Sequence, residues 1–190
     1  LTFLTTFATP TTRAAAFALI SDLHAGGVEN VEWQEGGAKN IATKSGATIV
    51  VTSTDPAGNT GGLSWAPSIF TFDGSTNDRL SKVTTMDDGS VTTRIFGTGP
   101  TADILLSDVA TGIVGAVNSM TTTYDTAGRV NSRTVTYDDG RSNHTEYDDS
   151  NRVDSRTDTT ATGYAATSYF NDSSQRASVF SDDSASNQYS

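Results

Sequence analysis

The sequence predicts a mainly β protein in which repeated antiparallel β-hairpins form an extended sheet or a solenoid-like array, with one N-terminal α-helix. Aspartate dominates the acids, since only four of the 22 acidic residues are glutamate, and aspartate and threonine favour turns and strands over helix interiors. Short strand-like runs alternate with turn signals, and the second half of the chain repeats itself. With 35% hydrophobic residues in 190, we expect a modest core in one elongated or two small units.

The helix is predicted over about residues 12–24. Thr11 and Thr12 offer an N-cap, an alanine-rich run follows, and Gly26 with Gly27 offers a stop. From residue 28 to 72 the pattern changes to short runs such as 47–52 and 68–72, which predict strands joined by turns.

Residues 100–117 combine apolar positions at a helical spacing with interrupting glycines, which predicts a short helix followed by a strand. We therefore expect an N-terminal domain over residues 1–70, made of the helix and short strands. Hairpin repeats follow over residues 71–190, with an irregular insert at about 97–120.

The most specific feature is a repeat in the second half of the chain. The heptapeptide Tyr-Asp-Thr-Ala-Gly-Arg-Val at 124–130 returns as Tyr-Asp-Asp-Ser-Asn-Arg-Val at 147–153, and more loosely at 170–176, so the aromatic residues lie 23 positions apart. An earlier copy starts at Phe72 and reaches Arg79 after a two-residue insertion. In the other half of the unit, Asp-Asp-Gly at 87–89 parallels Asp-Asp-Gly at 138–140.

Each half of the unit predicts a turn. In Asp-Asp-Gly the glycine supplies a positive φ and the aspartates cap the turn. In Tyr-Asp-x-x-Gly-Arg the aspartate can accept backbone N–H groups, the aromatic ring can pack on the next repeat, and Arg129 or Arg152 can pair with a turn carboxylate one unit away. The residues expected to build the repeats are Phe72, Asp73, Arg79, Tyr124, Asp125, Gly128, Arg129, Tyr137, Gly140, Tyr147, Asp148, Arg152, Phe170 and Arg176.

At these residues the chain resembles the YD-repeat family, the tyrosine-aspartate repeats of bacterial Rhs-type and wall-associated proteins and of animal teneurins. Residues 124–130 match the YDxxGR pattern in full, whereas Asn151 replaces glycine in the next copy, and Phe170 with Asn171 replaces Tyr-Asp in the last. The resemblance covers about residues 120–180, with a weaker match at 72–96, and leaves 1–70 uncovered.

The resemblance implies large extracellular proteins in which repeated hairpins build an extended sheet or a shell. Such proteins are sometimes proposed to bind carbohydrate and sometimes enclose a toxin. Three or four degenerate units are too few to close a shell, so the enclosing role is not expected here.

Composition excludes several classes of protein. A formal net charge of -10 with only 12 basic residues disfavours nucleic-acid binding, which depends on lysine and arginine. The chain contains no cysteine, which excludes disulfide scaffolds, thiolate zinc sites and cysteine nucleophiles. The longest apolar stretch, 14–20, is about two helical turns, so no membrane insertion is expected.

One motif is similar to a catalytic one. Asp22 and His24 in Ile-Ser-Asp-Leu-His resemble the first metal-binding motif of calcineurin-like phosphoesterases, and Asn143-His144 echoes another motif of that family. The chain has two histidines in all, and it lacks the family's intervening Gly-Asp-x-x-Asp segment. We therefore interpret Asp22 and His24 as polar residues in the last turn of the helix, and we expect no enzyme.

Two ligands remain open alternatives, while no other cofactor is expected. Calcium has weak candidate ligands at Asp138, Asp139, Asp148 and Asp149, and further aspartate pairs lie at 87–88 and 182–183, although aspartates that only cap turns explain the same pattern. Trp33 and Trp65 offer rings on which a sugar could stack, or else two core aromatic residues.

The function favoured by these observations is a non-catalytic structural or interaction module of an acidic extracellular or bacterial cell-surface protein. Its expected partners are other copies of itself or the rest of a larger polypeptide, since the chain starts at Leu1 as a processed or partial chain would. The alternative is a carbohydrate-binding or adhesin module, with glycans as partners, attached to a secreted enzyme or toxin.

Overall fold

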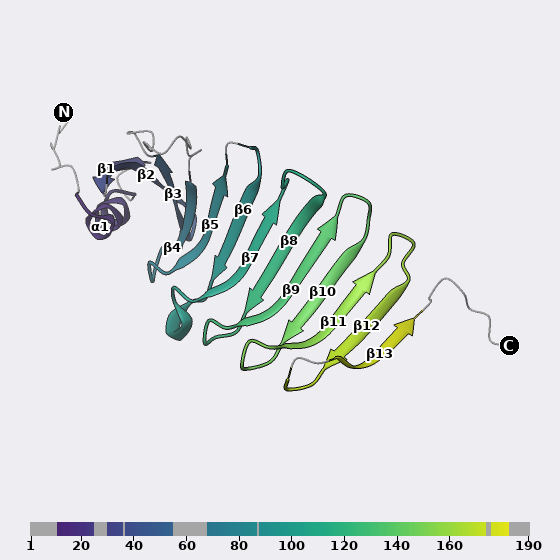
Figure 1. The fold of residues 1–190 in the computed structure, drawn as a ribbon. Helices are drawn as coiled ribbons and strands as arrows, with labels where there is room; N and C mark the ends of the chain where they lie inside the picture. The colour runs from purple at the N-terminus through teal and green to yellow at the C-terminus, as the bar shows by residue number, and fades with distance from the viewer. Residues whose placement is uncertain are drawn as a thin grey trace, which may run out of the picture. The chain divides into compact units, whose positions relative to one another are not determined.

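The structure, a computed structural model, describes residues 11–24, 30–35, 37–54, 68–86, 88–173 and 176–182. Within these ranges the protein is mainly β, with thirteen antiparallel strands and one short N-terminal helix (Figure 1). The hairpin fold expected from the sequence is therefore confirmed. The chain divides into two compact units, Leu1–Asp87 and Asp88–Ser190, whereas the sequence pattern changes near residue 70.

The first unit contains the helix and five strands in chain order. They are α1 (Arg13–His24), β1 (Asn30–Glu35), β2 (Ala38–Ser45), β3 (Thr48–Thr54), β4 (Ser68–Asp73) and β5 (Arg79–Thr85). Thr12 caps the helix as expected, because its Oγ1 accepts the N–H of Ala15 at 3.3 Å and its carbonyl accepts the N–H of Ala16 at 3.0 Å.

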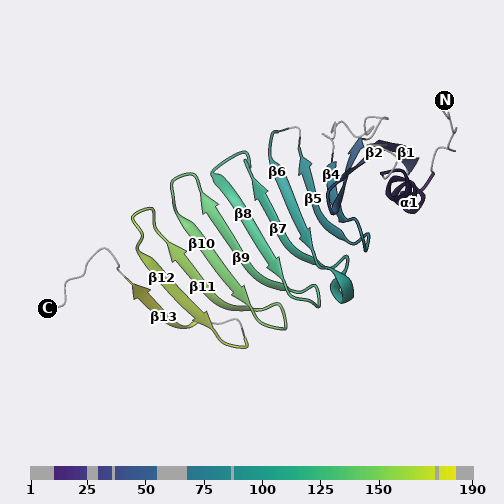
Figure 2. The ribbon, with the colours of Figure 1, turned by 180° about the vertical axis from the view of Figure 1, so that it is seen from behind.

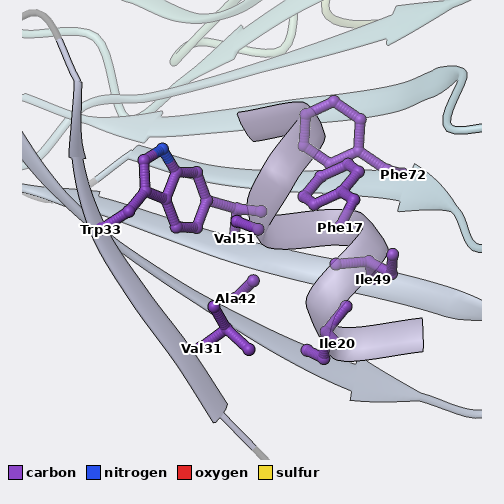
Figure 3. Packing of buried hydrophobic residues seen from close by; sticks show 9 residues of the cluster. Phe17, Ile20, Val31, Trp33, Ala42, Ile49, Val51 and Phe72 are labelled. Atoms are coloured by element: carbon purple, nitrogen blue, oxygen red, sulfur yellow. The ribbon is translucent and has the colours of Figure 1, made fainter. Parts of the chain in front are cut away.

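The helix packs on one face of the first unit's sheet and forms its apolar core (Figure 3). Phe17 of α1 lies edge-on to Phe72, with ring centroids 4.9 Å apart, and edge-on to Trp33 at 6.5 Å. Pairing places Val31 opposite Ala42 and Ala42 opposite Val51, so these side chains share the covered face. The buried hydrophobic residues are Ala16, Phe17, Ile20, Val31, Trp33, Ala42, Ile49, Val51 and Phe72.

The second unit is a meander in which each strand pairs with its neighbours in the chain (Figure 2). Its strands are β6 (Val91–Phe96), β7 (Leu105–Thr111), β8 (Val117–Tyr124), β9 (Val130–Tyr137), β10 (Ser142–Tyr147), β11 (Val153–Thr159), β12 (Ala165–Phe170) and β13 (Arg176–Asp182). A single 3₁₀ turn, η1 (Gly99–Thr101), lies between β6 and β7. Among the described residues of this unit, none forms an α-helix.

Of the short helix followed by a strand expected within residues 100–117, the helix is wrong and the strand is confirmed as β7; the region expected as an insert, about 97–120, contains η1, β7 and the start of β8. Only η1 is helical there, and Leu105–Thr111 is strand β7, paired with both β6 and β8. Leu105 and Val109 are four residues apart, a spacing that places two side chains on one face of a helix and equally on one face of a strand. The apolar spacing alone could not separate the two.

The second unit has no apolar core among its described side chains. Of the side chains whose burial is described, every buried hydrophobic one lies between Ala16 and Phe72, whereas the buried residues of the second unit are Gly97, Thr122 and Ser155. Cross-strand pairing therefore carries much of the stability of this sheet.

The two faces of the second unit's sheet differ in chemistry. The register aligns Thr122, Arg133, Thr145 and Arg156 on one face, which we call the arginine face. The other, the hydroxyl face, carries Ser-x-Thr-x-Thr patterns on three strands. These patterns are Ser119, Thr121 and Thr123 on β8, Ser132, Thr134 and Thr136 on β9, and Ser155, Thr157 and Thr159 on β11.

Candidate functional site

Four turns of the second unit share one backbone pattern. The first residue of each turn donates its N–H to the carbonyl of the fifth residue, and its carbonyl accepts the N–H of the fourth. The fourth residue has a positive φ, which is 78° at Gly128, 84° at Gly140, 58° at Asn151 and 90° at Gly163. This is the three-residue hairpin connection in which a type I turn is followed by a left-handed bulge residue.

An aspartate organises each turn of the Tyr-Asp type. Asp125 Oδ1 accepts the backbone N–H groups of Ala127 at 2.8 Å and Arg129 at 2.9 Å. Its Oδ2 accepts Nε of Arg129 at 2.7 Å and lies 2.6 Å from Nη2 of the same guanidinium. Asp148 and Arg152 repeat this geometry, with Nε to Oδ2 at 2.8 Å and Nη2 to Oδ2 at 2.7 Å.

The same arginines reach the next turn of the Tyr-Asp type. Nη1 of Arg129 donates to the backbone carbonyl of Asp149 at 3.0 Å, while Nη2 lies 3.2 Å from its Oδ1. Nη1 of Arg152 donates to the carbonyl of Asp172 at 2.7 Å, and Nη2 lies 3.6 Å from its Oδ1. We call this chain of contacts, formed by Asp125, Arg129, Asp148, Asp149, Arg152 and Asp172, the turn ladder.

Hydrogen bonding shifts the titration of the turn aspartates. The backbone N–H and then the side chain of Arg129 lower the pKa of Asp125, and Arg152 acts in the same way on Asp148. In the first unit the hydroxyl of Ser75 and the N–H groups of Thr76 and Ser75 lower the pKa of Asp73 to about 2. These aspartates are therefore ionised well below neutral pH.

The register corrects the alignment of Arg79 with Arg129, and it agrees with the 23-residue spacing, which places Arg176 at the position of Val130. Tyr124 pairs with Val130, and after the same register shift Phe72 pairs with Arg79 and Phe170 with Arg176. Arg79 and Arg176 thus occupy the valine position of the repeat, one residue after the ladder position. Tyr124 and Val130 are six positions apart, as are Phe170 and Arg176, whereas Phe72 and Arg79 are seven apart, so only the copy at Phe72 has a longer loop.

One copy of the turn was missed by sequence reasoning. Phe96 shows the same register shift, pairing with Leu105, and the N–H of Gly97 donates to the carbonyl of Ile104 at 2.9 Å. In this copy glycine, and not aspartate, follows the aromatic residue, and the loop contains Asp103 but no arginine, so its only signal is an aromatic residue followed by glycine. A Cβ on Gly97 would collide with the Thr101 carbonyl oxygen, so the turn requires glycine there.

The aromatic candidates lie in two environments. Tyr124, Tyr137, Tyr147 and Phe170 are half-buried on the sheet, whereas Trp33 is 2% exposed in the first unit's core, where its Nε1 donates to Glu35 at 3.2 Å. Trp33 therefore has no free ring face on which a sugar could stack, which corrects that expectation. Trp65 lies outside the described residues.

A groove opens on the arginine face beside the turns at 137–141 and 160–164. It has a volume of about 480 Å³, within the range of small-ligand pockets, and its lining includes Tyr137, Arg141, Asn143, Arg156, Asp158 and Tyr164. The guanidinium of Arg141 lies over the Tyr137 ring, 5.3 Å from the centroid, and its Nε donates to Asp139 Oδ2 at 2.7 Å. Although burial acts to raise the pKa of Asp158, hydrogen bonds from Arg156 and Asn143 bring it below its ordinary value.

The calcium candidates are engaged mainly by arginine and backbone donors. Asp139 pairs with Arg141, Asp148 with Arg152, and Asp149 with Arg129, while the Asp138 side chain is exposed. Asp88 accepts both the N–H and the hydroxyl of Ser90, whereas residue 87 and the side chains of 182–183 lie outside the described part. Among described residues no group of three metal-ligating side chains occurs.

The histidines do not share a described site. His24 lies with Asp22 in the last turn of α1, and neither side chain is described. On the hydroxyl face, His144 Nδ1 lies 2.8 Å from Thr134 Oγ1, and its Nε2 lies 3.7 Å from Glu146. Ser155 donates to that glutamate at 3.0 Å, so the carboxylate, and not the imidazole, contacts the serine. This order does not match a nucleophile activated by a histidine base.

Comparison with known proteins identifies no family for this chain, so any function must be argued from the fold and from these contacts. No protein-family model matches the chain, and no curated protein matches it significantly. Among the described residues, no helix combines the length and the apolar character needed to cross a membrane.

Proposed function

We propose that this protein is a non-catalytic structural and interaction module, built of YD-like hairpin repeats, within a larger assembly at the surface of a bacterial cell or in its secreted material. The observation that carries the proposal is the turn ladder, in which Arg129 and Arg152 each join one Asp-containing turn to the next. Such repetition stabilises an array through contacts between neighbouring units.

The thinness of the second unit supports this role. Its described hydrophobic side chains are not buried, and both faces of its sheet carry polar side chains. A sheet of this kind gains little from an internal core and leaves its surfaces available to neighbours. Its partners are therefore other copies of the chain or further parts of a longer polypeptide.

The resemblance to YD repeats supports the extracellular location. The turns that carry it, Asp125 to Arg129 and Asp148 to Arg152, use aspartate and arginine for structure, and their pairing leaves these groups less free for acid-base chemistry. Because Trp33 is buried, it does not support the alternative function of carbohydrate binding. That alternative is one of the outcomes that the titration with a saccharide, described below, can give.

Sedimentation velocity over a wide range of protein concentration tests the assembly role. We expect the sedimentation coefficient to rise with concentration at neutral pH. A monomer at every concentration would contradict association between copies. Location is tested by treating intact producing cells with a membrane-impermeant amine reagent, which should label Lys39, whose side chain is 43% exposed.

A further inference from the structure

The turns of the second unit lie in two rows, one at each end of its strands, and we call each row of turns an edge. The arginines of the two edges differ in their hydrogen-bond partners. On the edge with the turn ladder, Nε of Arg129 is bound by the aspartate of its own turn, and its terminal nitrogens bind Asp149, 20 residues further on. On the other edge Arg141 has the first half of this arrangement, because its Nε donates to Asp139 at 2.7 Å.

The second half is missing for Arg141. The residue 20 positions after it is Ala161, which has no carboxylate. The two turns are nevertheless neighbours, since a Cβ built on Gly140 would lie 3.6 Å from Cβ of Ala161. Within the described part of the chain, no hydrogen bond or ion pair is found between Arg141 and this neighbouring turn, and the side chain is 59% exposed at the rim of the groove.

We propose that the groove beside Arg141 binds an exposed aspartate turn of a second copy of this chain. The inference rests on the proposed function, and it names the surface through which copies associate. The guanidinium would take the exposed carboxylate of the incoming turn, as Arg129 takes that of Asp149.

The chain itself supplies a complementary partner. Asp172 lies in a turn of the opposite edge, and its side chain is 97% exposed. In the groove Arg156 is paired with Asp158, and Arg141 is paired through Nε with Asp139 of its own turn. The exposed carboxylate of Asp172 therefore meets the one arginine of the groove whose terminal nitrogens lack the partner turn that Arg129 has. A contact between opposite edges is heterologous and extends from copy to copy.

Supplying the missing acceptor within the chain tests this inference without removing any contact. In Ala161→Asp the new carboxylate should occupy Arg141 and weaken self-association about tenfold, as measured by sedimentation equilibrium. The matched control is Thr162→Asp, which adds the same charge one residue later in the same turn. Asp172→Asn should also weaken association, because it removes the incoming charge.

The outcomes separate this inference from the proposed function. If the wild type associates and Ala161→Asp behaves like Thr162→Asp, the groove is not the contact, although the assembly role stands. If the wild type stays monomeric at every concentration, the groove inference and association between copies both fail, and the proposed function then rests on contacts within a longer polypeptide. Titration with a galacturonate hexamer, followed by NMR, tests whether the groove binds a saccharide and not a second copy of the chain. Shifts confined to the Tyr137 and Tyr164 signals, with association unaffected by Ala161→Asp, would identify a saccharide as occupant and overturn the inference.

Discussion

Arg129 and Asp149 lie 20 residues apart in the chain, yet the guanidinium donates to the aspartate's carbonyl at 3.0 Å and lies 3.2 Å from its carboxylate. The same arginine is bound to Asp125 of its own turn at 2.6 Å. One side chain thus fixes the conformation of its own turn and the spacing to the next. This double role distinguishes the ladder from an ordinary surface ion pair, whose contribution to stability is often negligible.

Arg129→Gln should lower the melting midpoint by about 2–4 °C, because the variant loses contacts to two turns together. The matched control is Arg94→Gln, since Arg94 makes one exposed pair with Asp108 at 3.2 Å. Differential scanning calorimetry of both variants checks the prediction. Equal midpoints for the two variants would show that the ladder adds nothing beyond a surface pair.

Asn151→Ala should destabilise the protein by about 1 kcal/mol, because residue 151 has a φ of 58° that alanine adopts poorly. Asn151→Gly should leave stability unchanged or raise it. Urea denaturation measures both. Gly128→Ala is the matched case, since no atom lies within 4 Å of the added Cβ and only the φ of 78° opposes it. If Gly128→Ala has no effect, the positive φ does not limit stability.

Phe17→Ala should destabilise the first unit by about 3–5 kcal/mol, since Phe17 is 2% exposed and contacts both Trp33 and Phe72. The fluorescence of Trp33, recorded in a Trp65→Phe background, should shift to the red as the indole meets water. Ile69→Ala is the control, because Ile69 is 43% exposed and its loss should cost far less. A blue emission retained in the Phe17 variant would argue against this packing.

Stability should fall as pH is lowered from about 4 to about 2. The turn aspartates have lower pKa values in the folded protein than the ordinary 3.8, and that of Asp73 is about 2. A depressed carboxyl pKa stabilises the fold above the unfolded value, and this stabilisation is lost as pH falls through the folded value. Chemical denaturation at several pH values measures the loss. Asp73→Asn should flatten the dependence, and an unchanged slope would contradict the assignment.

Removal of calcium should leave the melting midpoint unchanged. Asp139 and Asp148 are bound by Arg141 and Arg152, and a calcium ion would have to displace those guanidinium groups. Thermal unfolding with excess EDTA and with added Ca²⁺ checks this. A midpoint that rises with Ca²⁺ and falls with EDTA would show that the aspartate turns bind the ion.

Sequence reasoning succeeded where a turn is defined by its own residues. The pattern from Asp125 to Arg129 contains the acceptor, the residue of positive φ and the cation, so its hairpin could be predicted. It failed where the determinant is register, as for Arg79, which pairs with Phe72 and so occupies the valine position and not the arginine position. The strand at Leu105 and the burial of Trp33 depend on which neighbours pack beside them, and a linear pattern does not contain that information.

The connectivity of the second unit has a consequence for how the protein is made. Each strand from β7 to β12 pairs only with the strands before and after it in the chain, so every contact of the sheet closes a short loop. Such local topology favours rapid folding. Each new hairpin can pair with the last strand already formed as soon as it leaves the ribosome or a secretion channel, before the C-terminus has been made. Repeats could then be gained or lost in evolution while the remaining hairpins still fold.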